Sequence, residues 1–255
     1  MESLKVTNLC KTYIVNKRQN NVLRNINLEI KAGEMVAVMG PSGSGKTTLL
    51  YTVSGMDDAT AGTVNFFGKE LTTLKNNEMS DLRLQEMGFV FQQMYMLKNL
   101  SIYDNIILPA YQAKQKNKKE RKMIKERAKV LMQKLGISDV SDNSVSEVSG
   151  GQLQRACICR SLINQPKIIF ADEPTGALNK QNSLEVMEEL MRINGEGTSI
   201  MLVTHDMKVA CRAQRVLYLE DGNVRDEMVL GKCNTSSDIR LRERQLNEWL
   251  IKMGW

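Results

Sequence analysis

The 255-residue sequence is poor in several residue types: it has one histidine, four prolines and 5% aromatic residues. It also lacks a run of the roughly eighteen apolar residues that a membrane-spanning helix requires, and its first residues do not form a signal-peptide pattern. We therefore expect a chain that remains on the cytoplasmic side of the membrane. Its five scattered cysteines are odd in number, which argues for reduced thiols rather than a disulfide framework. Cys157 and Cys159 are expected to be buried in a helix.

The formal net charge of +6 is concentrated in one segment. Eight of the residues from 114 to 127 are basic and two are acidic, so the rest of the chain is balanced. This distribution excludes the broad basic face that nucleic-acid backbones require. Ile124, Ala128, Leu131 and Leu135 follow at helical spacing and predict a helix with one packed stripe. Its basic face either is simply solvated or contacts the anionic inner membrane surface.

A glycine-rich segment, Gly40-Pro-Ser-Gly-Ser-Gly-Lys-Thr47, joins the apolar run from Met35 to Met39 to a helix start. Its three glycines allow successive N–H groups to point inward at an anion. In such a loop the Lys46 ammonium reaches the outer phosphates and the Thr47 hydroxyl is offered to Mg²⁺. The segment therefore predicts a site for a nucleoside triphosphate.

A second glycine turn, Ser149-Gly-Gly-Gln152, precedes the apolar and acidic segment from Ile168 to Glu173. A helix is expected to begin directly behind this turn, so its N–H groups and helix dipole suit a phosphate as well. One chain would then carry two phosphate-binding turns. That arrangement makes sense if each turn completes a site on a second copy of the chain.

With these two turns the sequence resembles the ATP-binding subunits of ABC transporters, and the likeness covers nearly the whole chain. Six motifs occur in the order typical of that family. The glycine-rich loop matches the Walker A motif, and Ser149–Gln152 match the signature. The remaining matches are Gln92, the Walker B strand from Ile168 to Glu173, the segment from Thr175 to Asn179, and His205. The pattern is most similar to the subfamily of macrolide export, lipoprotein release and antimicrobial-peptide resistance.

The resemblance implies roles for the matching residues. Glu173 would be the base that polarises the attacking water, His205 would contact the γ-phosphate, and Lys46 would neutralise charge during hydrolysis. Mg²⁺ would be held by Thr47, Gln92 and, through water, Asp172. The implied ATP-binding residues are Tyr13, stacked on adenine, with Gly40, Pro41, Ser42, Gly43, Ser44, Gly45, Lys46, Thr47, Thr48, Gln92, Ser149, Gly150, Gly151 and Gln152.

Two residues depart from the family pattern, and Val148, in place of the commoner leucine, is the conservative one. Asn179 stands where aspartate is usual, in a loop that the family places near the partner's catalytic site. Asparagine retains a hydrogen-bonding group but loses the charge. We expect altered coupling between two ATP sites and unchanged nucleotide binding.

The expected fold class is α/β, with a P-loop NTPase core of the RecA type, an antiparallel β layer and an inserted helical subdomain. The predicted ABC ATPase domain covers residues 1–230, with the helical subdomain at about 93–160, and an amphipathic tail covers residues 231–255. Alternating apolar residues mark the antiparallel layer on both sides of a turn expected at Ala61-Gly62. Asp221-Gly222 predicts a hairpin turn before a last strand.

The tail shows an apolar stripe formed by Leu246, Trp249, Leu250 and Met253. The opposite face is expected to carry Arg242, Arg244, Glu248 and Lys252. The stripe either packs on its own subunit or docks on a partner. Residues 93–97, rich in methionine, are likewise either buried or part of a socket for the membrane subunit.

Taken with the resemblance, these features predict the ATP-hydrolysing subunit of a membrane transporter, with ATP and Mg²⁺ as ligands. Its expected partners are a second copy in a head-to-tail dimer and an integral membrane permease that handles antimicrobial peptides or lipid-linked cargo. A mechanotransmitter that drives a membrane partner without moving cargo fits the same motifs. A soluble ABC protein of DNA repair or translation is disfavoured, because the long coiled-coil insertion or second cassette of such proteins is absent.

Overall fold

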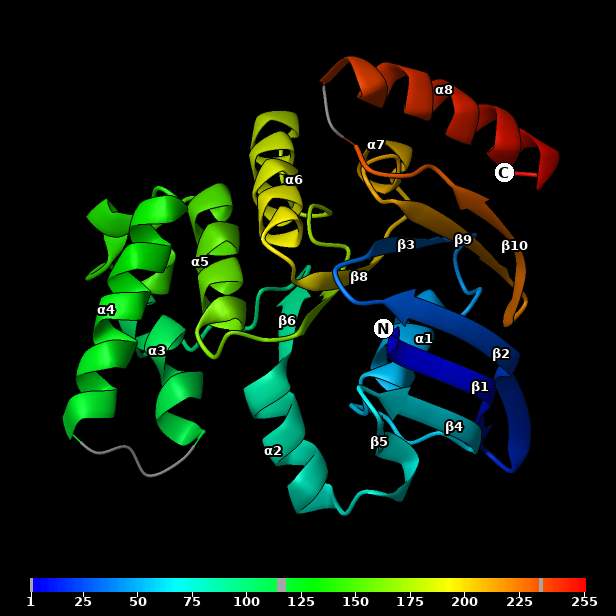
Figure 1. The fold of residues 1–255 in the computed structure, drawn as a ribbon, viewed down its shortest axis with the longest axis horizontal. Helices are drawn as coiled ribbons and strands as arrows, with labels where there is room; N and C mark the ends of the chain where they lie inside the picture. Colours follow the sequence, from blue (N-terminus) through cyan, green and yellow to red (C-terminus); the bar gives the residue numbers. More distant parts are fainter. Residues whose placement is uncertain (1, 114–117, 234–235) are drawn as a thin grey trace. The chain divides into compact units, whose positions relative to one another are not determined.

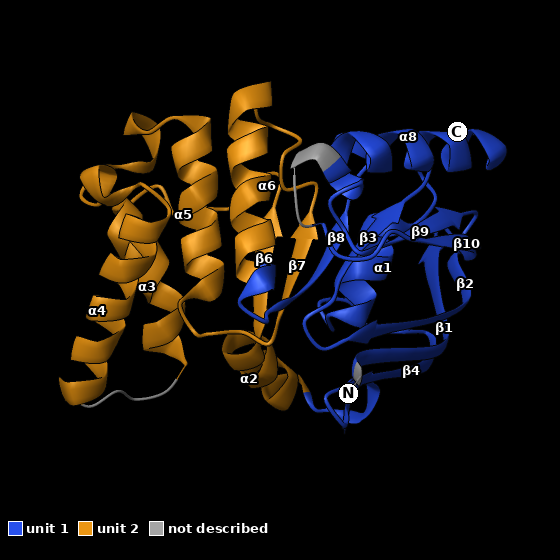
Figure 2. Cartoon of the chain, turned by 45° about the horizontal axis from the view of Figure 1, so that its top comes forward, with its two compact units in different colours: residues 1–75, 194–255 blue, residues 76–193 orange. Residues whose placement is uncertain are grey.

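The computed structural model describes residues 2–113, 118–233 and 236–255 (Figure 1). The described chain divides into two compact units, coloured separately in Figure 2. Unit 1 comprises residues 1–75 and 194–255, and unit 2 comprises residues 76–193. The predicted helical subdomain at 93–160 lies within the second range. Its proposed boundaries, and those of the domain at 1–230, stay predictions.

Unit 1 contains an antiparallel sheet with the strand order β2-β1-β4-β5. Its strands are β1 (Glu2–Val15), β2 (Arg18–Lys31), β4 (Ala61–Phe66) and β5 (Lys69–Glu70). Ile26, Ile30, Val64 and Phe66 are almost completely buried, which agrees with the alternation in the sequence. This is the antiparallel layer that the sequence predicts.

The turn expected at Ala61-Gly62 is wrong, because these residues begin β4. Ala61 pairs with Cys10 of β1, and Gly62 has a φ of +89°. A Cβ atom on Gly62 would lie 2.3 Å from the main-chain oxygen of Asn8. The glycine therefore serves a close approach between two strands, and this requirement resembles a turn signal in the sequence.

Unit 1 also carries the strand series β10-β9-β3-β8. Strand β3 (Met35–Met39) is parallel to β8 (Ser199–Val203) on one side and to β9 (Arg215–Glu220) on the other. Every residue of β3 and β8 is buried, as expected for continuous apolar runs in a parallel sheet. Asp221 and Gly222 form the predicted hairpin turn into β10 (Asn223–Val229), both with positive φ.

The helices of unit 1 are α1 (Lys46–Val53), α7 (Met207–Ala210) and α8 (Ser236–Lys252). In α8, Leu246 and Leu250 are fully buried, so the tail packs on its own chain. The prediction that Arg242 lies on the solvent face is wrong. Arg242 is only 4% exposed and donates hydrogen bonds to the main-chain oxygens of Cys211, Ala213 and Gly231.

Unit 2 is mainly helical. It comprises α2 (Asn76–Glu86), β6 (Met87–Phe91), α3 (Ile102–Gln112), α4 (Lys118–Lys134), α5 (Gly150–Leu162), β7 (Ile168–Asp172) and most of α6 (Lys180–Gly195). Strands β6 and β7 are parallel and in register from Met87 with Ile168 to Phe91 with Asp172. Cys157 and Cys159 are fully buried in α5, as predicted.

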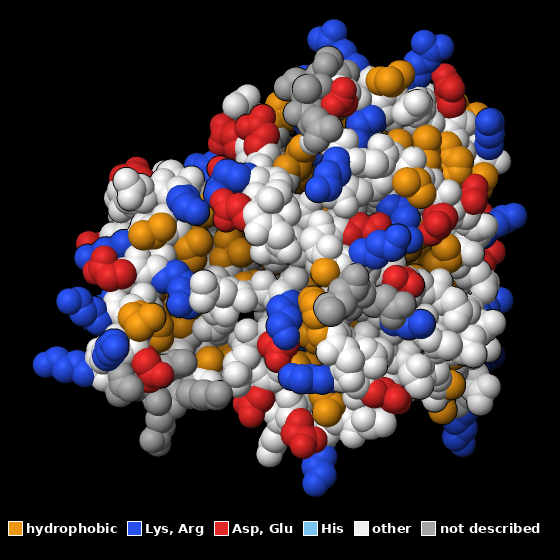
Figure 3. Space-filling view, viewed as in Figure 1, with side chains coloured by type: hydrophobic (Ala, Val, Ile, Leu, Met, Phe, Trp, Pro, Cys, Tyr) orange, Lys and Arg blue, Asp and Glu red, His pale blue; other side chains and the backbone are white. Residues whose placement is uncertain are grey.

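The basic segment enters α4 at Lys118, while residues 114–117 lie outside the described residues. The packed stripe of α4 includes Ile124, Ala128 and also Met132, whereas Leu131 is only partly buried. On the face shown in Figure 3, Lys and Arg side chains are interspersed with Asp and Glu side chains. Among the described residues, no helix is long and apolar enough to span a membrane.

Candidate functional site

The predicted phosphate loop connects β3 to α1 in unit 1. Gly40 is buried with a φ of +154°, and a Cβ atom there would lie 1.9 Å from the main-chain oxygen of Leu219. Gly43 and Gly45 have φ values of +81° and +100°, which glycine adopts at little cost. The loop therefore requires glycine at position 40 because a side chain would clash with Leu219, and at positions 43 and 45 because the backbone φ is positive.

Two side chains define the interior of this loop. The Lys46 Nζ donates to the main-chain oxygens of Gly40 at 2.8 Å and Pro41 at 2.9 Å, so its ammonium lies over the curled backbone. The buried hydroxyl of Ser44 has no hydrogen-bond partner within the part of the chain that the structure describes. A buried, unpaired hydroxyl in the same loop as a lysine ammonium fits a loop that receives an anionic oxygen.

The loop is supported from behind by the β9–β10 turn and by β2. The Gly222 N–H donates to the main-chain oxygen of Ser44 at 3.2 Å. A Cβ atom on Gly45 would lie 3.0 Å from the main-chain oxygen of Val22 in β2. The β9–β10 turn and β2 thus fix the conformation of the loop.

Tyr13 lies near the end of β1, and it is 36% exposed. Its hydroxyl donates to Asp57 Oδ2 at 2.5 Å and also takes part in a hydrogen bond with Thr48. Thr48 belongs to the first turn of α1, directly after the phosphate loop. The structure therefore brings the predicted adenine-stacking residue and the predicted phosphate loop together in unit 1. Burial raises the pKa of the Tyr13 phenol, and Asp57 raises it further.

His205 follows β8, the parallel neighbour of β3, and is exposed. The Thr204 N–H donates to the main-chain oxygen of Val38 at 3.1 Å. His205 and the phosphate loop therefore extend from the carboxyl ends of adjacent parallel strands, the edge at which ligands of open α/β sheets collect. Asp206 caps the short helix behind it by accepting from the Lys208 N–H.

Unit 2 carries the predicted acidic residues. Asp172 ends β7, and Glu173 follows it with a φ of +47°. A non-glycine residue in this left-handed region is uncommon and carries backbone strain. The Gly176 N–H closes a turn onto the Glu173 main-chain oxygen at 3.0 Å. Glu173 is thus held at a strained position immediately after a buried strand.

Gln92 follows β6, which is the parallel neighbour of β7. A Cβ atom on Gly176 would lie 2.9 Å from Gln92 Nε2, so the Gln92 side chain lies directly over Gly176. The structure therefore brings Gln92 close to the loop that begins at Glu173. The next residues also differ among themselves: Met94 is buried, whereas Tyr95 and Leu97 are exposed by 58% and 47%.

The predicted signature turn begins α5. Ser149 forms a capping box with Gln152, in which the Ser149 Oγ accepts from the Gln152 N–H at 3.3 Å and the Gln152 Oε1 accepts from the Ser149 N–H at 3.0 Å. Ser149 and Gly150 are exposed. A Cβ atom on Gly151 would lie 2.5 Å from the Asn182 side chain of α6, so this glycine allows two helices to approach closely.

Two residues behind the signature are functional candidates that sequence reasoning missed. The buried Gln154 donates from Nε2 to the main-chain oxygen of Pro174 at 2.7 Å. Arg155 forms an ion pair with Glu185 of α6 at 2.7 Å. These contacts tie the signature helix to the loop after Glu173 and to α6. No spacing rule links such distant residues, so the sequence alone contained no signal for them.

Asn179 has a local structural role. Its Oδ1 accepts a hydrogen bond from the Asn182 N–H at 2.9 Å, so the residue caps the start of α6. An aspartate at this position would make the same contact. The residue therefore retains its structural role without the charge that is usual in the family.

The chemistry of the predicted magnesium ligands is consistent with the ion. A hydroxyl from Thr47, an amide oxygen from Gln92 and a carboxylate from Asp172 are hard oxygen donors. Thr47 belongs to unit 1, and the other two belong to unit 2. Among the described residues, no group of three or more His, Cys, Asp and Glu side chains could hold a metal ion. The magnesium assignment stays a prediction.

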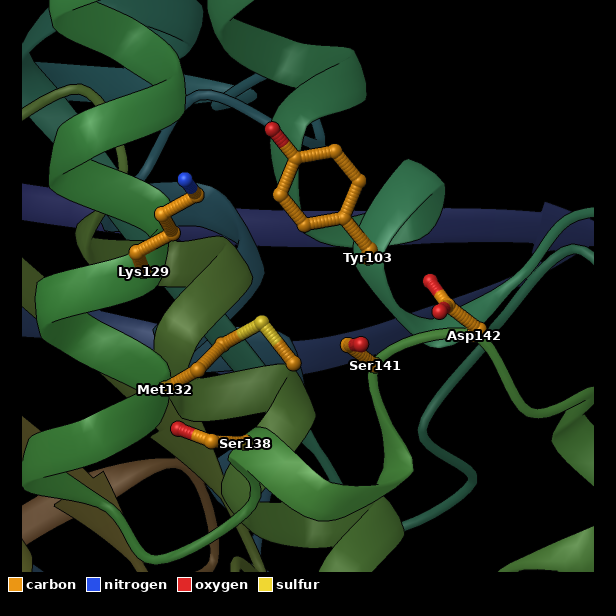
Figure 4. A pocket seen from close by; sticks show the side chains of 6 residues that line it. All are labelled: Tyr103, Lys129, Met132, Ser138, Ser141 and Asp142. Atoms are coloured by element: carbon orange, nitrogen blue, oxygen red, sulfur yellow. The ribbon is translucent and has the colours of Figure 1, made fainter.

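A separate pocket of about 270 Å³ lies in unit 2 and contains none of the predicted site residues. Tyr103 reaches it from α3, while Lys129 and Met132 reach it from α4 (Figure 4). Ser138, Ser141 and Asp142 complete the lining. Burial raises the pKa of Tyr103. The motifs lie elsewhere in the chain, so we do not assign the predicted chemistry to this pocket.

Comparisons with known proteins match this set of motifs. The family model described as ABC transporter matches residues 23–176. An ABC transporter ATP-binding protein from Bacillus subtilis, YknY, is 40% identical over 87% of this chain and 94% of that relative. The bacitracin export ATP-binding protein BceA of Halalkalibacterium halodurans is 38% identical over 91% of this chain and 90% of that relative.

Other relatives are longer. The macrolide export ATP-binding/permease protein MacB of Pasteurella multocida is 41% identical over 87% of this chain, which spans only 33% of MacB. Among solved structures, the dimeric ATP-binding cassette MJ0796, bound to ADP and Pi, has a TM-score of 0.82 and 35% identity. That match covers 90% of this chain and 100% of the solved one. The likeness confirms the predicted α/β fold class.

Proposed function

The chain belongs to the ABC transporter family and is an ATPase of that type, and from this premise we propose that it powers a membrane permease as its ATP-binding and hydrolysing subunit. The observation that carries the proposal is the presence of two phosphate-binding turns, at residues 40–47 and 149–152, in one chain. Two copies arranged head to tail would let each loop share an ATP with the partner's signature turn. The description of MJ0796 as a dimer supports this arrangement.

We assign the hydrolytic roles residue by residue. Glu173 takes the proton of the attacking water while the water oxygen forms a bond to the γ-phosphorus and the bond to the β-phosphate oxygen breaks, giving ADP and phosphate. Lys46 and the partner's signature turn neutralise the charge that moves onto the leaving oxygen, and His205 contacts the γ-phosphate. Thr47, Gln92 and, through water, Asp172 would hold Mg²⁺, which would supply further charge neutralisation when bound.

The proposed cargo class is antimicrobial peptides. Support comes from the relative named for bacitracin export, which this chain matches over most of both lengths. The relatives named for macrolide export combine an ATP-binding part with a permease in one chain, which supports a permease as the membrane partner. A position against the inner membrane face follows from that association.

The test is affinity purification of the tagged chain from detergent-solubilised membranes of its own host. We expect an integral membrane protein to co-purify, and hydrolysis by the complex to exceed that of the isolated chain and to respond to bacitracin. The matched control is Lys46→Ala, which should recover the same membrane partner but hydrolyse no ATP. Recovery of the chain without any membrane protein would contradict the proposal.

A further inference from the structure

The Asp57 carboxylate accepts hydrogen bonds from two residues of β1, Lys11 and Tyr13. One carboxylate oxygen, Oδ2, accepts from the Tyr13 hydroxyl at 2.5 Å, and the other, Oδ1, accepts from the Lys11 ammonium at 2.6 Å. Lys11 is only 7% exposed, and its Nζ also donates to the main-chain oxygen of Asp58 at 2.7 Å. The same Nζ lies 4.7 Å from the centre of the Tyr13 ring. These three side chains therefore form one connected group.

Within this group, Lys11 and Asp57 form an ion pair. Burial alone would raise the pKa of Asp57, but the hydrogen bonds from Lys11 and Tyr13 outweigh this effect and hold the pKa below its ordinary value. Hydrogen bonds to an ionised acceptor are shorter and stronger than neutral ones. Asp57 thus fixes the Tyr13 hydroxyl through a charge-assisted bond rather than an ordinary surface contact.

The segment that carries Asp57 is itself attached to the phosphate loop. It follows α1, and the Asp57 N–H donates to the main-chain oxygen of Tyr51 in that helix at 3.1 Å. Further along, Thr60 accepts from the Thr12 N–H through its Oγ1 at 2.9 Å. The segment that follows α1 is thereby bonded both to that helix and to the part of β1 that carries Tyr13.

We propose that Asp57, with Lys11, is a positioning residue that holds the Tyr13 ring at a fixed distance from the phosphate loop, so that the ring is preorganised to receive the base of a bound nucleotide. This inference rests on the proposed function, since it takes Tyr13 to stack on adenine. Fixing the ring in advance removes the entropy cost of ordering it on binding. The sequence contained no signal for Asp57, because its role depends on residues 44 and 46 positions away.

The test compares two ligands of the isolated chain by calorimetry: ATP, which has a base, and inorganic triphosphate, which has none. Tyr13→Phe retains the ring but removes the hydroxyl that donates to Asp57. Asp57→Asn weakens the same hydrogen bond by removing the charge of its acceptor. We expect each to reduce ATP affinity by roughly three- to tenfold, the worth of one hydrogen bond. The affinity for triphosphate should be unchanged in both. Asp58→Asn makes the same charge change at the exposed neighbouring residue and should alter neither affinity.

A second comparison separates positioning from general structural damage. If Asp57 acts through the Tyr13 hydroxyl, Asp57→Asn should have little further effect in the Tyr13→Phe background. Equal losses in both backgrounds would overturn the proposal, and so would a parallel loss of triphosphate affinity. The readout is nucleotide binding by the isolated chain. Failure to find a permease would therefore overturn the proposed function and leave this result intact.

Discussion

The Arg242 guanidinium donates from Nε to the main-chain oxygen of Cys211 at 2.6 Å. A charged side chain from the C-terminal helix thereby completes the hydrogen bonding of a buried carbonyl next to α7. The same guanidinium also reaches the main-chain oxygens of Ala213 and Gly231. Helix α8 is therefore fixed by directional contacts in addition to the burial of Leu246 and Leu250.

Arg242→Ala should destabilise the protein by about 3 kcal/mol, because it leaves buried carbonyl oxygens without a donor. In a protein of this size the melting temperature should fall by roughly 6–12 °C. Arg240→Ala is the matched control, since Arg240 is exposed on the same helix, and it should leave the melting temperature nearly unchanged. Equal effects of the two substitutions in thermal unfolding would show that the buried contacts contribute nothing.

Glu173→Gln should bind ATP and hydrolyse it at least about a hundredfold more slowly, in line with the usual contribution of a general base. The amide retains the shape of the side chain but cannot accept the proton. Phosphate release measures hydrolysis, and size-exclusion chromatography should show an ATP-bound dimer that accumulates. Hydrolysis at the wild-type rate would exclude Glu173 as the base.

A mixture of Lys46→Ala and Ser149→Arg chains should regain ATPase activity that neither variant has alone. A mixed dimer contains one site in which an intact phosphate loop faces an intact signature turn, whereas each homodimer contains none. Activity measured against the mixing ratio should therefore rise to a maximum between the two pure variants. If activity does not change with the mixing ratio, then either the two chains do not share their ATP sites or the two sites do not act independently.

Gly40→Ala and Gly43→Ala should differ sharply in ATP binding, although both add one methyl group to the same loop. At Gly40 the new Cβ would lie 1.9 Å from the main-chain oxygen of Leu219, whereas at Gly43 it would meet nothing within 4 Å. We expect Gly40→Ala to abolish binding. Gly43→Ala should cost only the backbone strain of a positive φ, about 1–2 kcal/mol. Calorimetric titration with ATP distinguishes the two, and equal losses would show that packing against Leu219 is unimportant.

Alkaline pH should destabilise the protein through its buried thiols. Burial raises the pKa of Cys157 and of Cys211 from 9.0 to about 11, so both stay neutral in the folded state. Their contribution is complete below pH 9, where the unfolded thiols are also neutral, and is lost as the pH rises toward 11. At pH 10 each thiol should cost about 1 kcal/mol. Urea unfolding at pH 8 and pH 10 measures this loss, and Cys211→Ala should reduce it.

The buried strands and the loops at their ends could be predicted from the sequence. The apolar runs at 35–39, 168–172 and 199–203 are strands in the structure, because continuous burial in a parallel sheet leaves a clear pattern. Asp221-Gly222 was equally readable, since a two-residue hairpin turn requires positive φ. Each of these features depends only on residues that are adjacent in the sequence.

The features that the sequence did not predict depend on distant partners. Arginine is usually exposed to solvent, so the sequence alone places Arg242 on the solvent face. Only its hydrogen bond to the main-chain oxygen of Cys211 shows that it is buried. Gly62 allows close approach to Asn8 rather than a turn. Asp57 and Gln154 look like ordinary polar residues until the chain folds. In each case the deciding contact joins residues that no periodicity relates.

The contact between Gly222 and Ser44 has a consequence for the order in which the protein forms during translation. The phosphate loop is made early, but the turn that supports it lies much later in the sequence and leaves the ribosome only after most of unit 2. Leu219, which closes against Gly40, is also synthesised late. A nascent chain that ends before these residues lacks the contacts of Leu219 and Gly222 that support the phosphate loop. ATP therefore becomes a stabilising ligand of the nascent chain only after Leu219 and Gly222 have been made.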